Sequence, residues 1–180
     1  TNSSITENTR VSYPIEHIQN IQPGSKGGHP KNIFFLTCDA YGVLPPISKL
    51  NPNQAAYHFM SGYTAKVAGT EAGVTEPKAV FSACFGAPFM PLHPAKYAER
   101  LKSKMHGQDI NVWLINTGWN GGSYGVGSRI PLKYTRIMIE NAINGSLENA
   151  KHVKDEIFGL SRIESIINIP ESILDPKKSW

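Results

Sequence analysis

The sequence is poor in the residues and segments that mark several protein classes. Only two cysteines occur among the 180 residues, Cys38 and Cys84, which is too few for a disulfide framework. Neither belongs to a CxxC or Cys/His metal-binding pattern. No apolar run approaches the roughly 18 to 20 residues of a membrane span, and the N-terminus has no apolar signal core. We therefore expect reduced, mostly buried thiols, a cytoplasmic location and no association with a membrane.

Strong positive charge and clustered metal ligands are absent as well. The net charge is +4, and the lysines and arginines are scattered rather than grouped with aromatic residues. This pattern favours an anionic small molecule as the ligand, and we expect no binding of nucleic acid. The six histidines show no HExxH motif or other close spacing, so no self-contained metal site is expected.

Apolar residues make up 40% of the chain, enough for the core of one domain or a large part of one. The continuous apolar run at residues 33–37 predicts a strand covered on both faces, and residues 110–115 predict a second strand. Helices are predicted at residues 94–105 and 132–144, the latter burying Tyr134, Met138 and Ala142.

Other segments are predicted from turn residues and short patterns. Asn51 and Pro52 begin a helix that we expect to end by Gly69, with Ala55, Phe59 and Tyr63 in one apolar stripe. The remaining expectations are a buried strand at residues 79–85, an edge strand or extended segment at residues 11–15 and 18–21, and short strands at residues 157–160 and 166–169.

The polar segment at about residues 66–77 contains two glycines that can act as hinges. We interpret it as a mobile lid over a ligand site, because lids need small hinge residues and few apolar anchors. The alternative is a plain surface connection.

The glycine-rich stretch at residues 116–136 lies between the predicted strand and the predicted helix, where α/β proteins present loops to ligands. Gly122 to Arg129 has the form GxxxxGSR, but Ser128 stands where a phosphate-binding P-loop has lysine, so this is not a P-loop. Backbone N–H groups, Arg129 and the hydroxyl of Thr135 remain suited to a nucleotide. The alternative is a glycine-rich turn with a solvated arginine.

Two further residues admit two interpretations each. Arg10 precedes an apolar segment and is either an anion clamp or an ordinary surface cation. Cys84 would need His58 or His93 as a base to be a nucleophile, and its apolar setting raises a thiol pKa and makes it inert.

Several long blocks of sequence closely resemble the ATP-dependent phosphoenolpyruvate carboxykinases and not the GTP-dependent class. They are TENTR at residues 6–10, HPKNIFFLTCDAYGVLPPISKL at 29–50, YHFMSGYTAKVAGTEAGVTEP at 57–77, FSACFGAPF at 81–89 and NTGWNGGSYGVGSRIPLKYTR at 116–136. The resemblance covers nearly the whole chain and weakens after about residue 147.

The resemblance implies a mixed α/β fold: a mixed sheet with flanking helices, part of the family's C-terminal mononucleotide-binding domain, with residues 1–180 as a single, partial domain. It implies conversion of oxaloacetate and ATP to phosphoenolpyruvate, CO2 and ADP in gluconeogenesis, with Mg2+ carried by the nucleotide and Mn2+ bridging to the substrate. In the family's pattern, Arg10 contacts both the transferring phosphoryl group and the organic acid, while Arg129, Ile130 and Thr135 contact the nucleotide. Residues 66–77 match the family's lid.

The family's P-loop, its metal ligands and the arginine that holds the substrate carboxylate have no counterpart in these residues. They belong to the upstream part of the enzyme, which is the expected partner of this chain. The sequence begins at Thr1 and resembles a piece of something longer. Without the P-loop and the metal ligands, the phosphates lose most of their electrostatic stabilisation, so we expect the chain alone to be inactive. The rival hypotheses are a noncatalytic nucleotide-binding fragment, a structural module without a ligand, and a hydrolase that uses Cys84.

Overall fold

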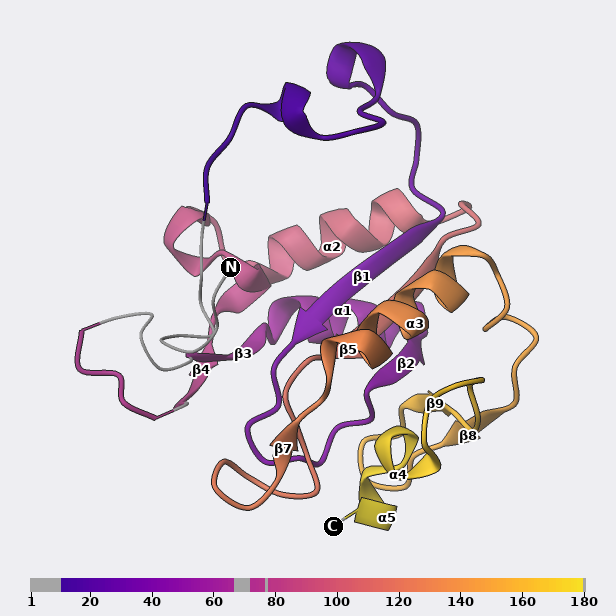
Figure 1. Ribbon diagram of the computed structural model, residues 1–180. Coiled ribbons are helices and arrows are strands. Elements are labelled where there is room, and N and C mark those ends of the chain that lie inside the picture. Colours follow the sequence, from indigo (N-terminus) through magenta and orange to yellow (C-terminus); the bar gives the residue numbers. More distant parts are fainter. Residues whose placement is uncertain (1–10, 67–71, 77, 180) are drawn as a thin grey trace.

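The computed structural model describes residues 11–66, 72–76 and 78–179 (Figure 1). Its centre is a five-stranded sheet with the strand order β1-β5-β2-β9-β8. β1 and β5 are parallel, and the other neighbouring pairs are antiparallel. The strands of this sheet are β1 (Asn32–Thr37), β2 (Ile47–Leu50), β5 (Asn111–Asn116), β8 (His152–Lys154) and β9 (Ser161–Ile163).

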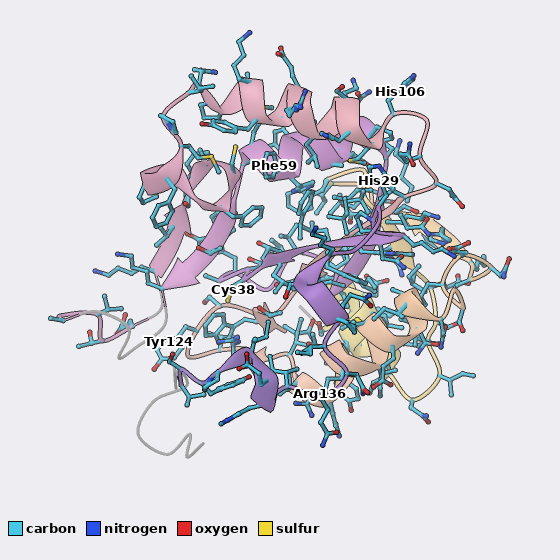
Figure 2. The ribbon with its side chains drawn as sticks, turned by 90° about the horizontal axis from the view of Figure 1, so that it is seen from above. His29, Cys38, Phe59, His106, Tyr124 and Arg136 are labelled. Atoms are coloured by element: carbon cyan, nitrogen blue, oxygen red, sulfur yellow. The ribbon has the colours of Figure 1, made fainter. Side chains whose placement is uncertain are left out.

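Helices cover both faces of the sheet, as the view along its edge shows (Figure 2). On one face, α1 (Pro52–Met60) and α2 (Pro94–Met105) pack over an apolar cluster that includes Phe35 and Leu114. On the other face, α3 (Leu132–Ile143) packs over a cluster that includes Trp113 and Ile115. The mixed sheet with flanking helices that the sequence predicted is confirmed.

The smaller elements surround this body. Within the described residues they are the strands β3 (Tyr63–Lys66), β4 (Lys78–Phe81), β6 (Trp119–Asn120) and β7 (Ser128–Arg129), the short helices α4 (Glu171–Leu174) and α5 (Pro176–Ser179), and the 3-10 helices η1 (Ile15–His17), η2 (Pro23–Ser25), η3 (Ala83–Phe85) and η4 (Ala87–Phe89).

The predicted start of α1 is confirmed in detail. The Asn51 side chain accepts hydrogen bonds from the backbone N–H groups of Asn53 and Gln54, and Gln54 Oε1 accepts one from the Asn51 N–H. This reciprocal cap satisfies donors that the first turn leaves without partners.

The helix ends before Gly69, as expected, but the prediction that Tyr63 lies on it is wrong. α1 ends at Met60, and Tyr63 belongs to β3, which pairs with β4. Gly62 allows the change of direction, because a Cβ atom there would overlap the carbonyl oxygen of Ser82. The four-residue spacing of Tyr63 from Phe59 was therefore coincidental, and contacts remote in sequence decided the structure.

The buried strand predicted at residues 79–85 is only half correct. β4 ends at Phe81, whose side chain is exposed, and the chain then enters the 3-10 turn η3. Cys84 adopts a φ of 53° there and is buried. The apolar run is split between a short hairpin and a turn, which periodicity does not distinguish from a strand.

Other expectations for strands also fail. Residues 157–160 and 166–169 lie in turns and irregular segments, and Tyr134 is only partly buried. Residues 11–21 contain η1 and no strand, which leaves the extended segment of the two alternatives. The sequence analysis missed β2, in the middle of the sheet, and Leu36 of β1 is 53% exposed although both faces of that strand were expected to be covered.

Ser48 provides a test of how tightly the sheet is packed. It lies on β2 opposite Leu114 with 0% exposure, and its Oγ has no hydrogen-bond partner among the described residues. Since a buried hydroxyl without a partner is costly, Ser48→Ala should raise the free energy of unfolding by about 1 kcal/mol. Urea unfolding measures this, with Ser165→Ala at an exposed position as the control. A loss of stability specific to Ser48→Ala would contradict it.

Candidate functional site

The candidate site lies at the carboxyl ends of the parallel strands β1 and β5. In α/β proteins, loops that follow such strand ends are where ligands bind. β1 ends at Thr37 and β5 at Asn116, and these two residues are partners in the register. The loops that follow the two strands therefore begin side by side, at the carboxyl ends of the strands.

Asn116 ties the two loops together. Its Oδ1 accepts hydrogen bonds from the N–H groups of Asp39 (3.1 Å) and Gly118 (2.9 Å), and its Nδ2 donates to the carbonyl of Leu44 (2.9 Å). The Trp119 N–H donates to the Asp39 carbonyl at 2.9 Å. Because Asn116 is 0% exposed, these bonds are shielded from water and fix the loops relative to each other.

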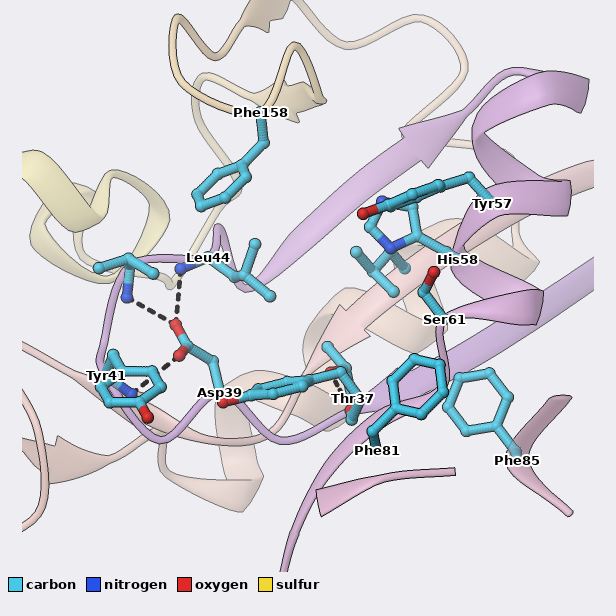
Figure 3. A pocket seen from close by; sticks show the side chains of 13 residues that line it. Thr37, Asp39, Tyr41, Leu44, Tyr57, His58, Ser61, Phe81, Phe85 and Phe158 are labelled. Carbon is cyan, nitrogen blue, oxygen red and sulfur yellow. Dashed lines mark hydrogen bonds between the residues drawn. The ribbon is translucent and has the colours of Figure 1, made fainter. Parts of the chain in front are cut away.

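The Asp39 side chain holds its own loop in shape. Its carboxylate accepts three backbone hydrogen bonds, from Tyr41 (2.8 Å), Val43 (2.6 Å) and Leu44 (2.7 Å), drawn as dashed lines in Figure 3. The residue is 1% exposed. A carboxylate that is buried and occupied in this way anchors a loop and is not positioned to take a proton from a substrate.

The glycine-rich loop after β5 ends in a hairpin. β6 and β7 pair with Trp119 opposite Arg129, and α3 begins only at Leu132. A P-loop instead passes from a strand through its glycines directly into a helix. The structure therefore supports the conclusion drawn from Ser128, which stands where a P-loop has lysine. This loop does not bind phosphates in the manner of a P-loop.

The hairpin loop touches the loop that Asp39 holds. Gly42 has a φ of 72°, and a Cβ there would come within 2.7 Å of the Gly122 carbonyl oxygen. Between the loops lies a cavity of about 380 Å3, lined by Tyr41, Gly121, Gly122, Ser123 and Val126. This volume is within the roughly 300 to 1,000 Å3 that small-molecule sites occupy.

Arg129 stands at the base of the hairpin in a fixed orientation. Its Nε donates to the Thr117 carbonyl at 2.9 Å, and its guanidinium lies 5.0 Å from the centre of the Trp119 ring. Stacking on an aromatic face and a hydrogen bond from Nε both hold the guanidinium plane, which limits the entropy lost when such a group binds an anion or a base.

The other predicted nucleotide-binding residues lie close to Arg129 in the chain but are less accessible. Ile130 donates its N–H to the Gly118 carbonyl at 2.9 Å, and Thr135 lies in the first turn of α3. Each is 6% exposed. The structure thus gathers Arg129, Ile130 and Thr135 at the junction of β7 and α3. Arg10 lies outside the described residues, as do residues 67–71 and 77 of the predicted lid.

A second cavity, of about 390 Å3, lies beside the loop of Asp39 (Figure 3). Aromatic rings dominate its wall, and His58 and Ser61 face it from the end of α1. Burial lowers the pKa of His58. Burial first, then the neighbouring Tyr41 and Asp39, raises the pKa of Tyr63 to about 12, so this phenol stays protonated at neutral pH. The wall consists of Thr37, Asp39, Tyr41, Val43, Leu44, Tyr57, His58, Ser61, Tyr63, Phe81, Phe85, Leu114 and Phe158.

The cysteine nucleophile receives no support. Burial raises the pKa of Cys84, and its Sγ contacts the Pro94 carbonyl at 3.8 Å. His93 uses Nδ1 to accept the Ala95 N–H at the start of α2. A protonated thiol without an adjacent base is a poor nucleophile.

The described part of the chain contains no group of three His, Cys, Asp or Glu side chains that could hold a metal ion. The Mg2+ and Mn2+ that the resemblance implies therefore find no ligand set in these residues. Nor does any helix within residues 11–66, 72–76 and 78–179 combine the length and apolar character needed to cross a membrane.

Comparison with known proteins decides the family. A family model described as phosphoenolpyruvate carboxykinase matches residues 1–172. The chain belongs to the phosphoenolpyruvate carboxykinase family.

Curated carboxykinases named phosphoenolpyruvate carboxykinase (ATP) show the same relationship. That of Flavobacterium johnsoniae is 68% identical and that of Christiangramia forsetii 66%, each over 177 residues and 98% of this chain. That of Geotalea uraniireducens is 58% identical over 177 residues. The chain spans about a third (33%) of the length of these relatives.

Sequence reasoning missed the residue that joins the two loops of this carboxykinase chain. Asn116 ends an otherwise apolar strand, and a polar residue at that position was the available signal. Its three hydrogen bonds reach Asp39, Gly118 and Leu44. Two of these partners lie more than 70 residues away in the chain, with separations of 77 and 72, so local patterns did not reveal them.

Proposed function

We propose that this chain is the nucleotide-side part of an ATP-dependent phosphoenolpyruvate carboxykinase in the cytoplasm. The whole enzyme converts oxaloacetate and ATP to phosphoenolpyruvate, CO2 and ADP. The observation that carries the proposal is the family match over residues 1–172, together with relatives whose names specify ATP.

ATP, when bound, supplies the phosphoryl group. The residues of this chain would position it. Arg129, with its plane held by Thr117 and Trp119, would lie against the nucleotide at the β6–β7 hairpin, and the glycines of that loop let the ligand approach the backbone. Ile130 and Thr135 would shape the wall behind it. Arg10 would contact the transferring phosphoryl group and the organic acid, where fixed positive charge stabilises the transition state.

The described residues offer no metal site, so the divalent ions and the P-loop would come from the rest of the polypeptide. Residues 66–77 would form the lid, and β3 and β4, which pair with each other on either side of that segment, would be its base. A lid needs such an anchored base so that its tip can move while the site remains assembled.

A full-length chimera tests this function. In it, the segment of the Flavobacterium johnsoniae carboxykinase that matches this chain is replaced by the residues of this chain. With oxaloacetate, ATP, Mg2+ and Mn2+, the chimera should form phosphoenolpyruvate at a rate comparable to that of the parent enzyme, whereas the 180-residue chain alone should not. A folded but inactive chimera would refute the proposal, and activity of the chain alone would refute the need for the remaining part.

Arg129→Ala in the chimera should raise the KM for ATP by roughly 10-fold to 100-fold and leave the KM for oxaloacetate nearly unchanged, because a stacked, charged contact is lost on the nucleotide side only. Arg129→Lys should recover little, since lysine keeps the charge but not the planar fork. Arg100→Ala, at an exposed position on α2, is the control. Equal effects on both substrates would show that Arg129 supports the fold rather than the nucleotide.

A further inference from the structure

The two edges of the five-stranded sheet are built differently. The β8 edge is three residues long and carries His152 and Lys154. Short, charged edge strands resist pairing with other strands. The β1 edge is six residues long, and its sequence NIFFLT has no charge and no proline. β8 is thus protected as a free edge, and β1 is not.

Backbone groups along β1 alternate between the sheet and the outside. The Lys31 and Thr37 carbonyls accept the N–H groups of Asn111 and Thr117 of the β5 side. In a parallel ladder with this register, Ile33, Phe35 and Thr37 bond to β5, while Asn32, Phe34 and Leu36 turn their N–H and C=O groups outward. No described residue forms a backbone hydrogen bond with these outward groups, since β1 pairs with β5 alone.

The side chain of Leu36 adds an apolar surface to this edge. It lies opposite Ile115 in the register, yet it is 53% exposed while Ile115 is fully buried. The α3 layer therefore does not extend over the carboxyl end of β1. On the opposite face this end is covered, since Thr37 is buried and its Oγ1 donates a hydrogen bond to the Tyr63 carbonyl of β3. The surface at Leu36 is next to the loop of Asp39, at the end of the sheet where the candidate site lies.

The segment that precedes β1 does not cover this edge. Residues 11–31 are exposed throughout, and in Figure 1 they rise away from the body of the protein above α2 before entering β1. This segment carries five large apolar side chains that contact no core: Val11, Tyr13, Ile15, Ile18 and Ile21.

We infer that the β1 edge receives a further β-strand from the two thirds of the carboxykinase polypeptide that lie outside this chain. The incoming strand bonds to the outward groups of Phe34 and Leu36, and its apolar side chains cover Leu36. The relatives are long enough to contain such a strand, because this chain covers only 33% of the length of each. The sheet of the complete protein thus continues past β1, and strand addition joins the two parts beside the nucleotide loops.

Hydrogen exchange of single amides tests the inference independently of activity. In the full-length chimera, the amides of Phe34 and Leu36 should exchange at least about 100-fold more slowly than in the 180-residue chain, since each becomes part of a ladder. The amide of Lys154 is the internal reference, because it faces outward on β8, whose partner bonds run through Lys151 and Asp155.

Three results would overturn the inference. Exchange of the Leu36 amide as fast as that of Lys154 in the chimera would show that the β1 edge stays open. Protection already present in the 180-residue chain would assign the edge to the chain's own residues. Protection that disappears on dilution, together with the mass of a dimer, would assign it to a second copy.

A pair of variants gives a second readout. Leu36→Pro removes the outward N–H, and Leu36→Ala removes the side chain but keeps that N–H. On an open edge, proline is tolerated because its missing donor would face water. We therefore expect Leu36→Pro, and not Leu36→Ala, to abolish the slow exchange at Phe34 in the chimera. Unchanged protection in Leu36→Pro would contradict strand pairing.

Discussion

Replacing Asp39 with alanine should lower the free energy of unfolding by about 4 kcal/mol, because hydrogen bonds to a charged acceptor contribute roughly 1.5 to 3 kcal/mol each and buried donors left alone cost more. The carboxylate is 1% exposed and accepts the N–H groups of Tyr41, Val43 and Leu44. Without it, three backbone donors of a partly buried loop lose their partner.

Urea unfolding of the 180-residue chain, followed by tryptophan fluorescence, measures this loss, since Trp113 and Trp119 are both buried. Asp39→Asn separates charge from shape. It keeps one acceptor oxygen but places an NH2 group against a backbone donor, so we expect it to lose at least about half as much stability. Asp109→Ala, at an exposed position, should change stability little. Equal effects at positions 39 and 109 would contradict the anchoring role.

Gly118→Ala should be at least as damaging, with a loss of about 3 to 5 kcal/mol or failure to fold. A Cβ at this position would come within 2.7 Å of the Asp39 carbonyl carbon and closer still to its nitrogen and oxygen. Those are backbone atoms, so no change of rotamer relieves the overlap. The two loops of the site would have to separate, breaking the bonds that Asn116 makes to both.

The matched control is Gly28→Ala. No atom lies within 4 Å of a Cβ built at Gly28, and it lies in an exposed segment. This change should be neutral or slightly stabilising, because alanine restricts the unfolded chain. Soluble yield and the urea midpoint report both variants. A stable Gly118→Ala protein with an unchanged fluorescence spectrum would show that the loops are not held in contact as described.

The sequence predicted the elements whose patterns are long and local. α2 and α3 follow helical periodicity over twelve residues each, and β1 and β5 are continuous apolar runs. Elements held by remote partners were missed or misplaced. β2 is four residues long and lies between β5 and β9, and β3 begins just after a helix because it pairs with β4.

In the candidate site, too, some features could be predicted from the sequence and others could not. Glycines, Arg129 and Thr135 were visible in the sequence, and the resemblance added Ile130. The geometry that holds them was not visible, since it depends on Asn116, on the Thr117 carbonyl and on the Trp119 ring. Each of these is an ordinary residue or backbone group whose importance comes from the register of β1 against β5.

The pairing of β1 with β5 also determines when the site can form during folding. Asn32 pairs with Asn111, so about 80 residues must be looped out before the two strands meet, and closing such a loop costs chain entropy before any bond repays it. The backbone hydrogen bonds inside α1 and α2 join residues only a few positions apart, so these helices can form earlier. The loops of Asp39 and Gly118 are not fixed relative to each other until Asn116 bonds to both. During synthesis on the ribosome, the nucleotide side of this protein would therefore be among the last parts to become ordered, and conditions that slow β1–β5 pairing should delay ligand binding more than they delay helix formation.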